Sequence, residues 1–78
     1  MADRRADTPW LSAAADDLNA EFRWYRGLYL YVLDCNDGWW EWVVSHDEAR
    51  TDPIADHESR SCDAAKRAAE STAERVTG

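Results

Sequence analysis

The feature that most constrains this chain is a short polar turn between two aromatic segments. Residues 34–38 end in Asp37-Gly38, and an Asp-Gly pair between apolar runs is typical of a β-hairpin. The runs on either side, residues 28–33 and 39–44, are rich in aromatic and β-branched residues, which favour strands. The sequence therefore predicts an antiparallel hairpin at the centre of the chain.

A helix is predicted before the hairpin. Thr8 is a suitable N-cap, and Pro9 is suited to the first helical position. Apolar residues from Leu11 to Leu18 then recur at helical spacing. Asp16 and Asp17 come late in this helix, where its dipole disfavours acidic residues, so we expect it to end near Asn19.

Further strands and a second helix complete the expected fold. Residues 22–25 are expected to form a strand, Gly27 marks a bulge or a tight turn after it, and residues 54–55 are a candidate edge strand. Ser61 is the expected N-cap of an alanine-rich C-terminal helix, in which Lys66 and Glu70 are spaced to pair. The predicted fold class is α+β, with an N-terminal helix, a short antiparallel sheet of three or four strands around a central hairpin, and the C-terminal helix.

The length bounds the domain organisation and the function. We expect residues 1–7 to be a flexible tail and residues 8–78 to form a single α+β domain. A chain of 78 residues is too short for a large enzyme with an enclosed cofactor site. No apolar run approaches the ~20 residues of a membrane span, and the charged first residues do not suggest a secretory signal. We therefore expect a cytoplasmic protein with reduced Cys35 and Cys62.

The negative charge is concentrated in the middle of the sequence. Residues 34–58 contain eight acidic residues and one base, Arg50, so this segment accounts for the whole net charge of −7. Such a segment repels the phosphates of nucleic acids and attracts basic protein surfaces. An alternative is that the acidity is a solvation signature of a salt-adapted proteome, because only one base is a lysine.

Seven residues are the candidates for binding a partner. Trp39 and Glu41 are expected on one face of a strand. If that face is buried, Glu41 needs a partner such as Arg23 or Arg26; if it is exposed, the aromatic ring beside the carboxylate can anchor a basic surface. The others are acidic residues after that strand: Asp47, Glu48, Asp52, Asp56 and Glu58. Because the predicted strands are apolar on both faces, a homodimer is a further expectation.

Metal binding and catalysis have weaker support. Residues 34–38 resemble part of a calcium loop, but a hairpin turn explains them better. Zinc could use Cys35, His46, His57 and Cys62, although no short Cys-x-x-Cys spacing is present. A Cys/His nucleophile has no accompanying oxyanion hole in the sequence. We predict no cofactor and no enzymatic activity, and a small zinc-dependent regulator stays an alternative.

The plan of the chain resembles small acidic inhibitors encoded by phages and mobile elements, including anti-CRISPR and other host-takeover proteins. The likeness is carried by the strand 39–44 after Asp37-Gly38, the acidic loop up to Glu58, and the helix around residues 64–70. It concerns architecture and charge, and it transfers no functional residue. The resemblance implies a non-enzymatic module that inhibits or regulates a nucleic-acid-binding protein by occupying its basic surface, without binding nucleic acid directly.

Overall fold

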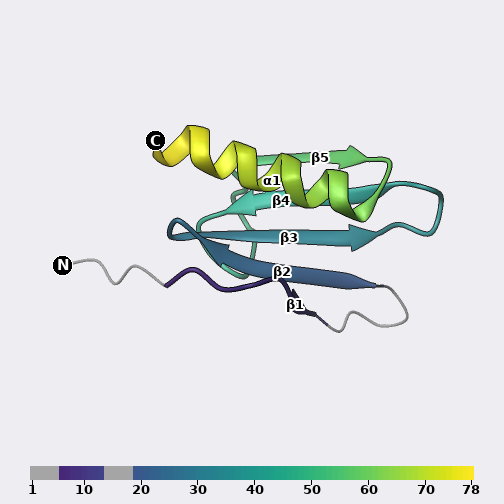
Figure 1. Cartoon of the computed structure of the whole chain (residues 1–78), viewed down its shortest axis with the longest axis horizontal. Coiled ribbons are helices and arrows are strands. Elements are labelled where there is room, and N and C mark those ends of the chain that lie inside the picture. Colours follow the sequence, from purple (N-terminus) through teal and green to yellow (C-terminus); the bar gives the residue numbers. More distant parts are fainter. Residues whose placement is uncertain (1–5, 14–18) are drawn as a thin grey trace.

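The chain forms one antiparallel sheet with a helix against one face (Figure 1). In this computed structural model, residues 6–13 and 19–78 are described. The strands follow one another across the sheet in chain order. The elements are β1 (Leu11–Ser12), β2 (Ala20–Tyr25), β3 (Leu28–Asp34), β4 (Trp40–Ser45), β5 (Ala55–Ser59) and α1 (Cys62–Thr77). No helix of the described ranges is long and apolar enough to cross a membrane.

Tight turns connect the central strands. Arg26 and Gly27, with φ values of 56° and 80°, join β2 to β3 in a two-residue turn of the kind that matches strand twist. Asn36 and Gly38 also have positive φ, at 63° and 88°, in the turn from β3 to β4. The predicted central hairpin is confirmed, with Tyr31 opposite Val43.

The first face of the sheet packs against α1. Three helix residues, Ala65, Ala69 and Ala73, are completely buried against a sheet surface that includes Leu30 and Val44. Alanine side chains let the helix approach closely, and the larger strand residues fill the space between the layers. The alanine-rich C-terminal helix is therefore confirmed, and the Ser61 hydroxyl caps it by accepting from the Ala64 N–H.

The second face carries a row of aromatic rings. Phe22 stacks on Tyr29 and Tyr29 on Tyr31, with centroids 5.6 Å and 6.3 Å apart. The loop from β4 to β5 crosses behind the sheet in Figure 1, and its Arg50 guanidinium lies 4.0 Å from the Tyr31 ring centroid. Tyr29 and Tyr31 are buried within the single chain. The expected homodimer stays a prediction, but it loses the support of an uncovered apolar face.

The predicted N-terminal helix is wrong. The Thr8 hydroxyl accepts from the Trp24 N–H and caps no helix, and Leu11 pairs with Phe22 in the short strand β1. The edge of β2 offers backbone partners that outweigh the local helix signals of this segment. Residues 14–18, which the predicted helix includes, lie outside the described residues. The sheet also has five strands, where three or four were predicted.

Candidate functional site

The register of β4 and β5 gathers three acidic residues on one face. Glu41 lies directly opposite Glu58, and Val43 lies opposite Asp56. Residues at opposite positions of an antiparallel pair share a face, so these carboxylates line the sheet face that α1 leaves open. Glu41 is half-buried, whereas Asp56 and Glu58 are exposed. We call Glu41, Asp56 and Glu58 the acidic edge.

Within the described parts of the chain, no base lies within ion-pair distance of the acidic edge. Its three carboxylates form no ion pair there, whereas Arg23 pairs with Glu70 and Lys66 with Glu21 on the helix side of the sheet. Like charges at opposite positions destabilise a sheet. The acidic edge therefore holds mutual repulsion that a bound cation could relieve.

Trp39 lies at one end of the acidic edge. Trp39 immediately precedes β4, and the Arg60 guanidinium immediately after β5 lies 4.0 Å from its ring centroid. The ring is half-buried. The residue predicted as an aromatic anchor is therefore next to Glu41 and Glu58, with Arg60 covering its ring.

The other three predicted residues lie in the β4–β5 loop, beyond the opposite ends of the strands. Asp47 has a structural part here, because its carboxylate accepts from the Arg50 N–H and its carbonyl from the Ser45 hydroxyl. Glu48 and Asp52 are exposed. The structure thus divides the predicted acidic surface into a group on the strands and a group on the loop.

Cys35 lies near the acidic edge without the properties of a nucleophile. Burial raises the pKa of its thiol, the Glu41 N–H opposes that rise, and the charges of Glu41, Asp37 and Glu58 add to it. A raised pKa keeps the sulfur protonated at neutral pH, and a protonated thiol is a poor nucleophile. This environment gives no support to a Cys/His nucleophile.

The four candidate zinc ligands are dispersed. The His57 ring packs against Trp42 on the helix side, and Cys62 begins α1. Cys35 lies after β3, and His46 follows β4. Across residues 6–13 and 19–78, no group of three or more His, Cys, Asp or Glu is arranged to hold a metal ion.

The polar turn has its own local explanation. The Asp34 carboxylate accepts from the Asn36 N–H, and the Asp37 carboxylate accepts from the Trp39 N–H. Such bonds from Asp to the backbone two residues on are typical of turns. These bonds favour the interpretation of residues 34–38 as a hairpin turn.

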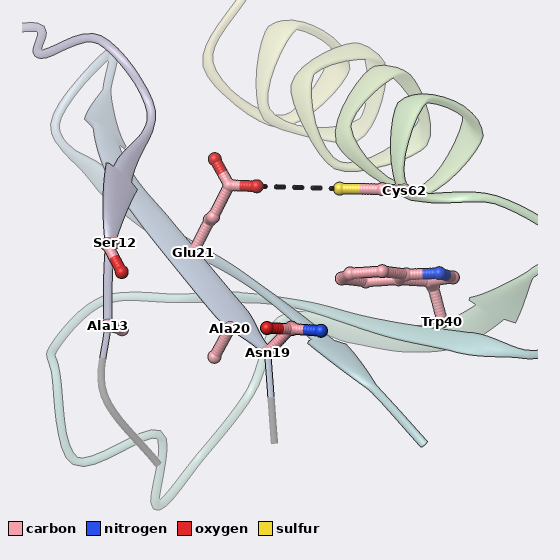
Figure 2. Close-up of a pocket in the computed structure, with 7 residues that line it drawn as sticks. All are labelled: Ser12, Ala13, Asn19, Ala20, Glu21, Trp40 and Cys62. Atoms are coloured by element: carbon pink, nitrogen blue, oxygen red, sulfur yellow. Dashed lines mark hydrogen bonds between the residues drawn. The ribbon is translucent and has the colours of Figure 1, made fainter. Parts of the chain in front are cut away.

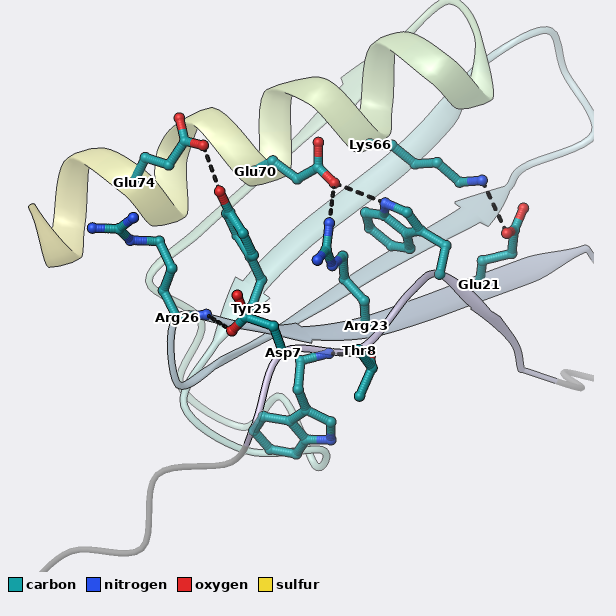
Figure 3. A network of polar contacts seen from close by, with 11 residues as sticks. Asp7, Thr8, Glu21, Arg23, Tyr25, Arg26, Lys66, Glu70 and Glu74 are labelled. Carbon is teal, nitrogen blue, oxygen red and sulfur yellow. Dashed lines mark hydrogen bonds and ion pairs between the residues drawn. The ribbon is translucent and has the colours of Figure 1, made fainter.

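A polar ladder between β2 and α1 was missed in the sequence (Figure 3). It has three rungs: Lys66 Nζ with Glu21 Oε1 at 2.9 Å, Arg23 with Glu70, and Tyr25 Oη with Glu74 Oε2 at 2.6 Å. Successive rungs are four residues apart on the helix, which is about 6.0 Å, and two residues apart on the strand, which is about 6.7 Å. Because the two spacings are similar, the rungs stay nearly aligned. The predicted pairing of Lys66 with Glu70 along the helix gives way to this ladder.

One pocket opens at the end of the ladder (Figure 2). It has a volume of about 440 Å³, and its lining includes Glu21, Trp40 and Cys62. The Cys62 thiol donates to the Glu21 carboxylate at an S–O distance of 3.6 Å. Burial raises the pKa of this thiol; nearby Lys66 lowers it, and Glu21 raises it further. The pocket thus presents a protonated thiol and a carboxylate that Lys66 already neutralises.

Comparison with family models, with curated proteins and with solved structures finds no match to this chain.

Proposed function

We propose that this chain is a non-enzymatic binding module that inhibits or regulates a nucleic-acid-binding protein by occupying its basic surface. The acidic edge is the observation that carries the proposal. Glu41 and Glu58 face each other across adjacent strands, and no described base pairs with either. A basic partner gains attraction and at the same time relieves the repulsion between these carboxylates.

The distribution of the bases supports a protein partner over a nucleic acid. Lys66 and Arg23 are engaged with carboxylates of the ladder, and Arg50 and Arg60 lie over aromatic rings. Binding to nucleic acid draws on several Lys and Arg side chains that contact phosphates. Surfaces that bind nucleic acid are themselves rich in such side chains, which makes them complementary to the acidic edge.

The first test is affinity capture with two matched variants. The tagged chain is compared with a variant E41Q/D56N/E58Q and with a variant D47N/E48Q/D52N, which loses the same charge from the loop. We expect the native chain to capture a nucleic-acid-binding partner. The strand variant E41Q/D56N/E58Q should lose this partner, and the loop variant should still capture most of it. Capture that is indifferent to the strand substitutions contradicts the proposal.

The second test is competition with nucleic acid. Binding to the captured partner should weaken steeply between low and moderate salt, because exposed charge pairs are screened within about 8–10 Å. DNA or RNA that binds the partner should displace the chain. A ternary complex, with nucleic acid and chain on overlapping basic sites, contradicts occupation of that surface.

A further inference from the structure

The outer edge of β5 has an orientation that can be derived from two backbone bonds. The Cys35 N–H donates to the Trp39 carbonyl at 3.0 Å, and hydrogen-bonding residues alternate along an antiparallel strand. The odd-numbered residues of β4 therefore direct their N–H and C=O groups toward β3, and the even-numbered residues direct theirs toward β5. Consistent with this, the Val44 carbonyl accepts from the Ile54 N–H at 2.7 Å.

This alternation determines which backbone groups of β5 leave the sheet. Trp42 and Val44 lie opposite His57 and Ala55, so those residues direct their N–H and C=O groups toward β4. Asp56 and Glu58 therefore direct theirs away from the sheet, where β5 is the last strand. Asp56 and Glu58 are the two exposed acidic residues of the acidic edge, and no backbone bond to their outward groups is found within residues 6–13 and 19–78.

We infer that β5 is a docking edge for an extended basic strand of a partner protein. The inference rests on the proposed function and states how its partner is held. An added strand pairs its backbone with Asp56 and Glu58, and basic side chains two residues apart lie opposite the two carboxylates on the same face. Backbone bonds then align the partner, while the charges select a basic sequence.

A second copy of this chain is a poorer occupant of the same edge. Antiparallel pairing of β5 with itself sets Asp56 and Glu58 against the same acidic residues, and like charges at opposite positions repel. Charged side chains on edge strands commonly prevent self-association in this way. The same acids that exclude a second copy leave the edge open to a basic strand.

The test compares two synthetic peptides on the native chain. One is a hexapeptide of alternating lysine and valine, and the other has the same side chains with N-methyl groups on the backbone amides of the lysines, which are the residues placed opposite Asp56 and Glu58. N-methylation removes backbone donors and keeps every charge, so we expect binding about tenfold weaker, the loss of one or two hydrogen bonds. Equal affinity for the two peptides would contradict strand pairing at β5, but it would be compatible with binding through charge alone.

Amide hydrogen exchange measures the effect of peptide binding on each backbone N–H of β5. In the free chain we expect slow exchange at His57 and fast exchange at Asp56 and Glu58. The unmethylated peptide should slow the last two. Unchanged exchange there, or slowing that depends only on the concentration of the chain itself, overturns the inference.

A variant pair gives an independent check. Glu58→Pro deletes an outward N–H that β4 does not use, whereas Glu58→Gln removes the charge and keeps that donor. The proline variant should bind the peptide more weakly than the glutamine variant, and equal affinities overturn strand pairing. The proposed function fails on a different result: the variant E41Q/D56N/E58Q would capture the partner as well as the native chain does.

Discussion

At the residue scale, the Glu70 carboxylate joins three segments of the chain through its hydrogen bonds. Its Oε2 atom accepts from Arg23 and from the Trp10 indole N–H, the latter at 2.9 Å. The Arg23 Nε atom is buried and has no hydrogen-bond partner among the described residues. The guanidinium therefore depends on Glu70, which ties the N-terminal segment, β2 and α1 together.

Replacing Glu70 should destabilise the fold. Glu70→Ala leaves partly buried donors of Arg23 and Trp10 without an acceptor, and such groups cost about 1–3 kcal/mol. Urea denaturation measures the free energy of unfolding, with Arg67→Ala as a control because Arg67 is an exposed charge on the same helix. An equal effect of the two substitutions contradicts the importance assigned to Glu70.

Replacing Glu58 should instead increase the stability of the fold. Glu58→Lys replaces a like-charge cross-strand pair by an opposite-charge pair with Glu41, which should raise stability by about 0.2–1 kcal/mol. Thermal unfolding at low salt measures the gain. In a Glu41→Gln background most of the gain should vanish, and a gain of the same size there means that the pair is not its source.

Individual residues of the acidic edge could be selected from sequence, but their meeting could not. Glu41, Asp56 and Glu58 stand out as charges near apolar strands. Their apposition depends on the β4–β5 register, which follows a long loop without an Asp-Gly type of turn signal. The contact of Arg50 with Tyr31 in that loop is a tertiary one, which no local pattern indicates.

At the element scale, the two ends of the chain show where local signals suffice. The C-terminal helix has a cap, a continuous alanine stripe and good helix formers, and it forms as predicted. The N-terminal segment has a cap residue and apolar spacing as well. There the backbone of β2 offers the Thr8 N–H an acceptor, the Trp24 carbonyl, at 2.9 Å, and sheet pairing prevails.

The alanine stripe should tolerate little added volume. Ala69 is completely buried in the middle of α1, so Ala69→Leu forces the helix away from the sheet and should cost about 1–3 kcal/mol. Chemical denaturation of this variant is compared with that of Ser71→Leu, an exposed site on the same helix. Equal stability of the two variants is inconsistent with close packing at Ala69.

Because of the ladder, the free energy of unfolding should decrease at alkaline pH. The hydrogen bond to Glu74 raises the pKa of Tyr25 above 10.0. Burial lowers the pKa of Lys66, but its hydrogen bond to Glu21 and neighbouring negative charges raise it overall above 10.5. Because the folded state holds both protons more tightly, their stabilisation is complete below pH 10 and is lost as pH rises through the raised values.

The measurement is the free energy of unfolding between pH 9 and 12. It should fall as pH rises, and it should fall less in a variant Y25F/K66M. Burial also raises the pKa of Tyr29, so the quantity of interest is the difference between the native chain and this variant. Parallel curves for the two proteins contradict the ladder's part in the pH dependence.

At the scale of the whole molecule, charge is divided between the two layers. On the helix side, Arg23 and Lys66 pair with carboxylates of the ladder, whereas the carboxylates of the acidic edge are unpaired within residues 6–13 and 19–78. The acidic edge holds three of the eight acidic residues of the segment 34–58, and the other five lie at the β3–β4 turn and in the β4–β5 loop. A salt-adapted domain is the rival interpretation, and it requires no particular partner.

Salt should stabilise the native chain modestly by screening the acidic edge. The variant E41Q/D56N/E58Q should lose most of that stabilisation, which thermal unfolding from low to molar salt measures. A salt response that these substitutions do not change favours general solvation of acidic residues. In either case the peptide and capture experiments decide whether the acids bind a partner.

The order of the strands also determines how the chain can fold. Each strand pairs with its neighbour in sequence, so the sheet can grow by successive short-range hairpins, which generally form fast. The ladder instead joins residues 45 to 49 positions apart, and Trp10 reaches Glu70 across 60 positions. Because the ladder can form only when β2 has been brought beside α1 through the intervening strands, we expect docking of α1 to be a late step of folding. Substitutions in the ladder should therefore accelerate unfolding while leaving the refolding rate nearly unchanged.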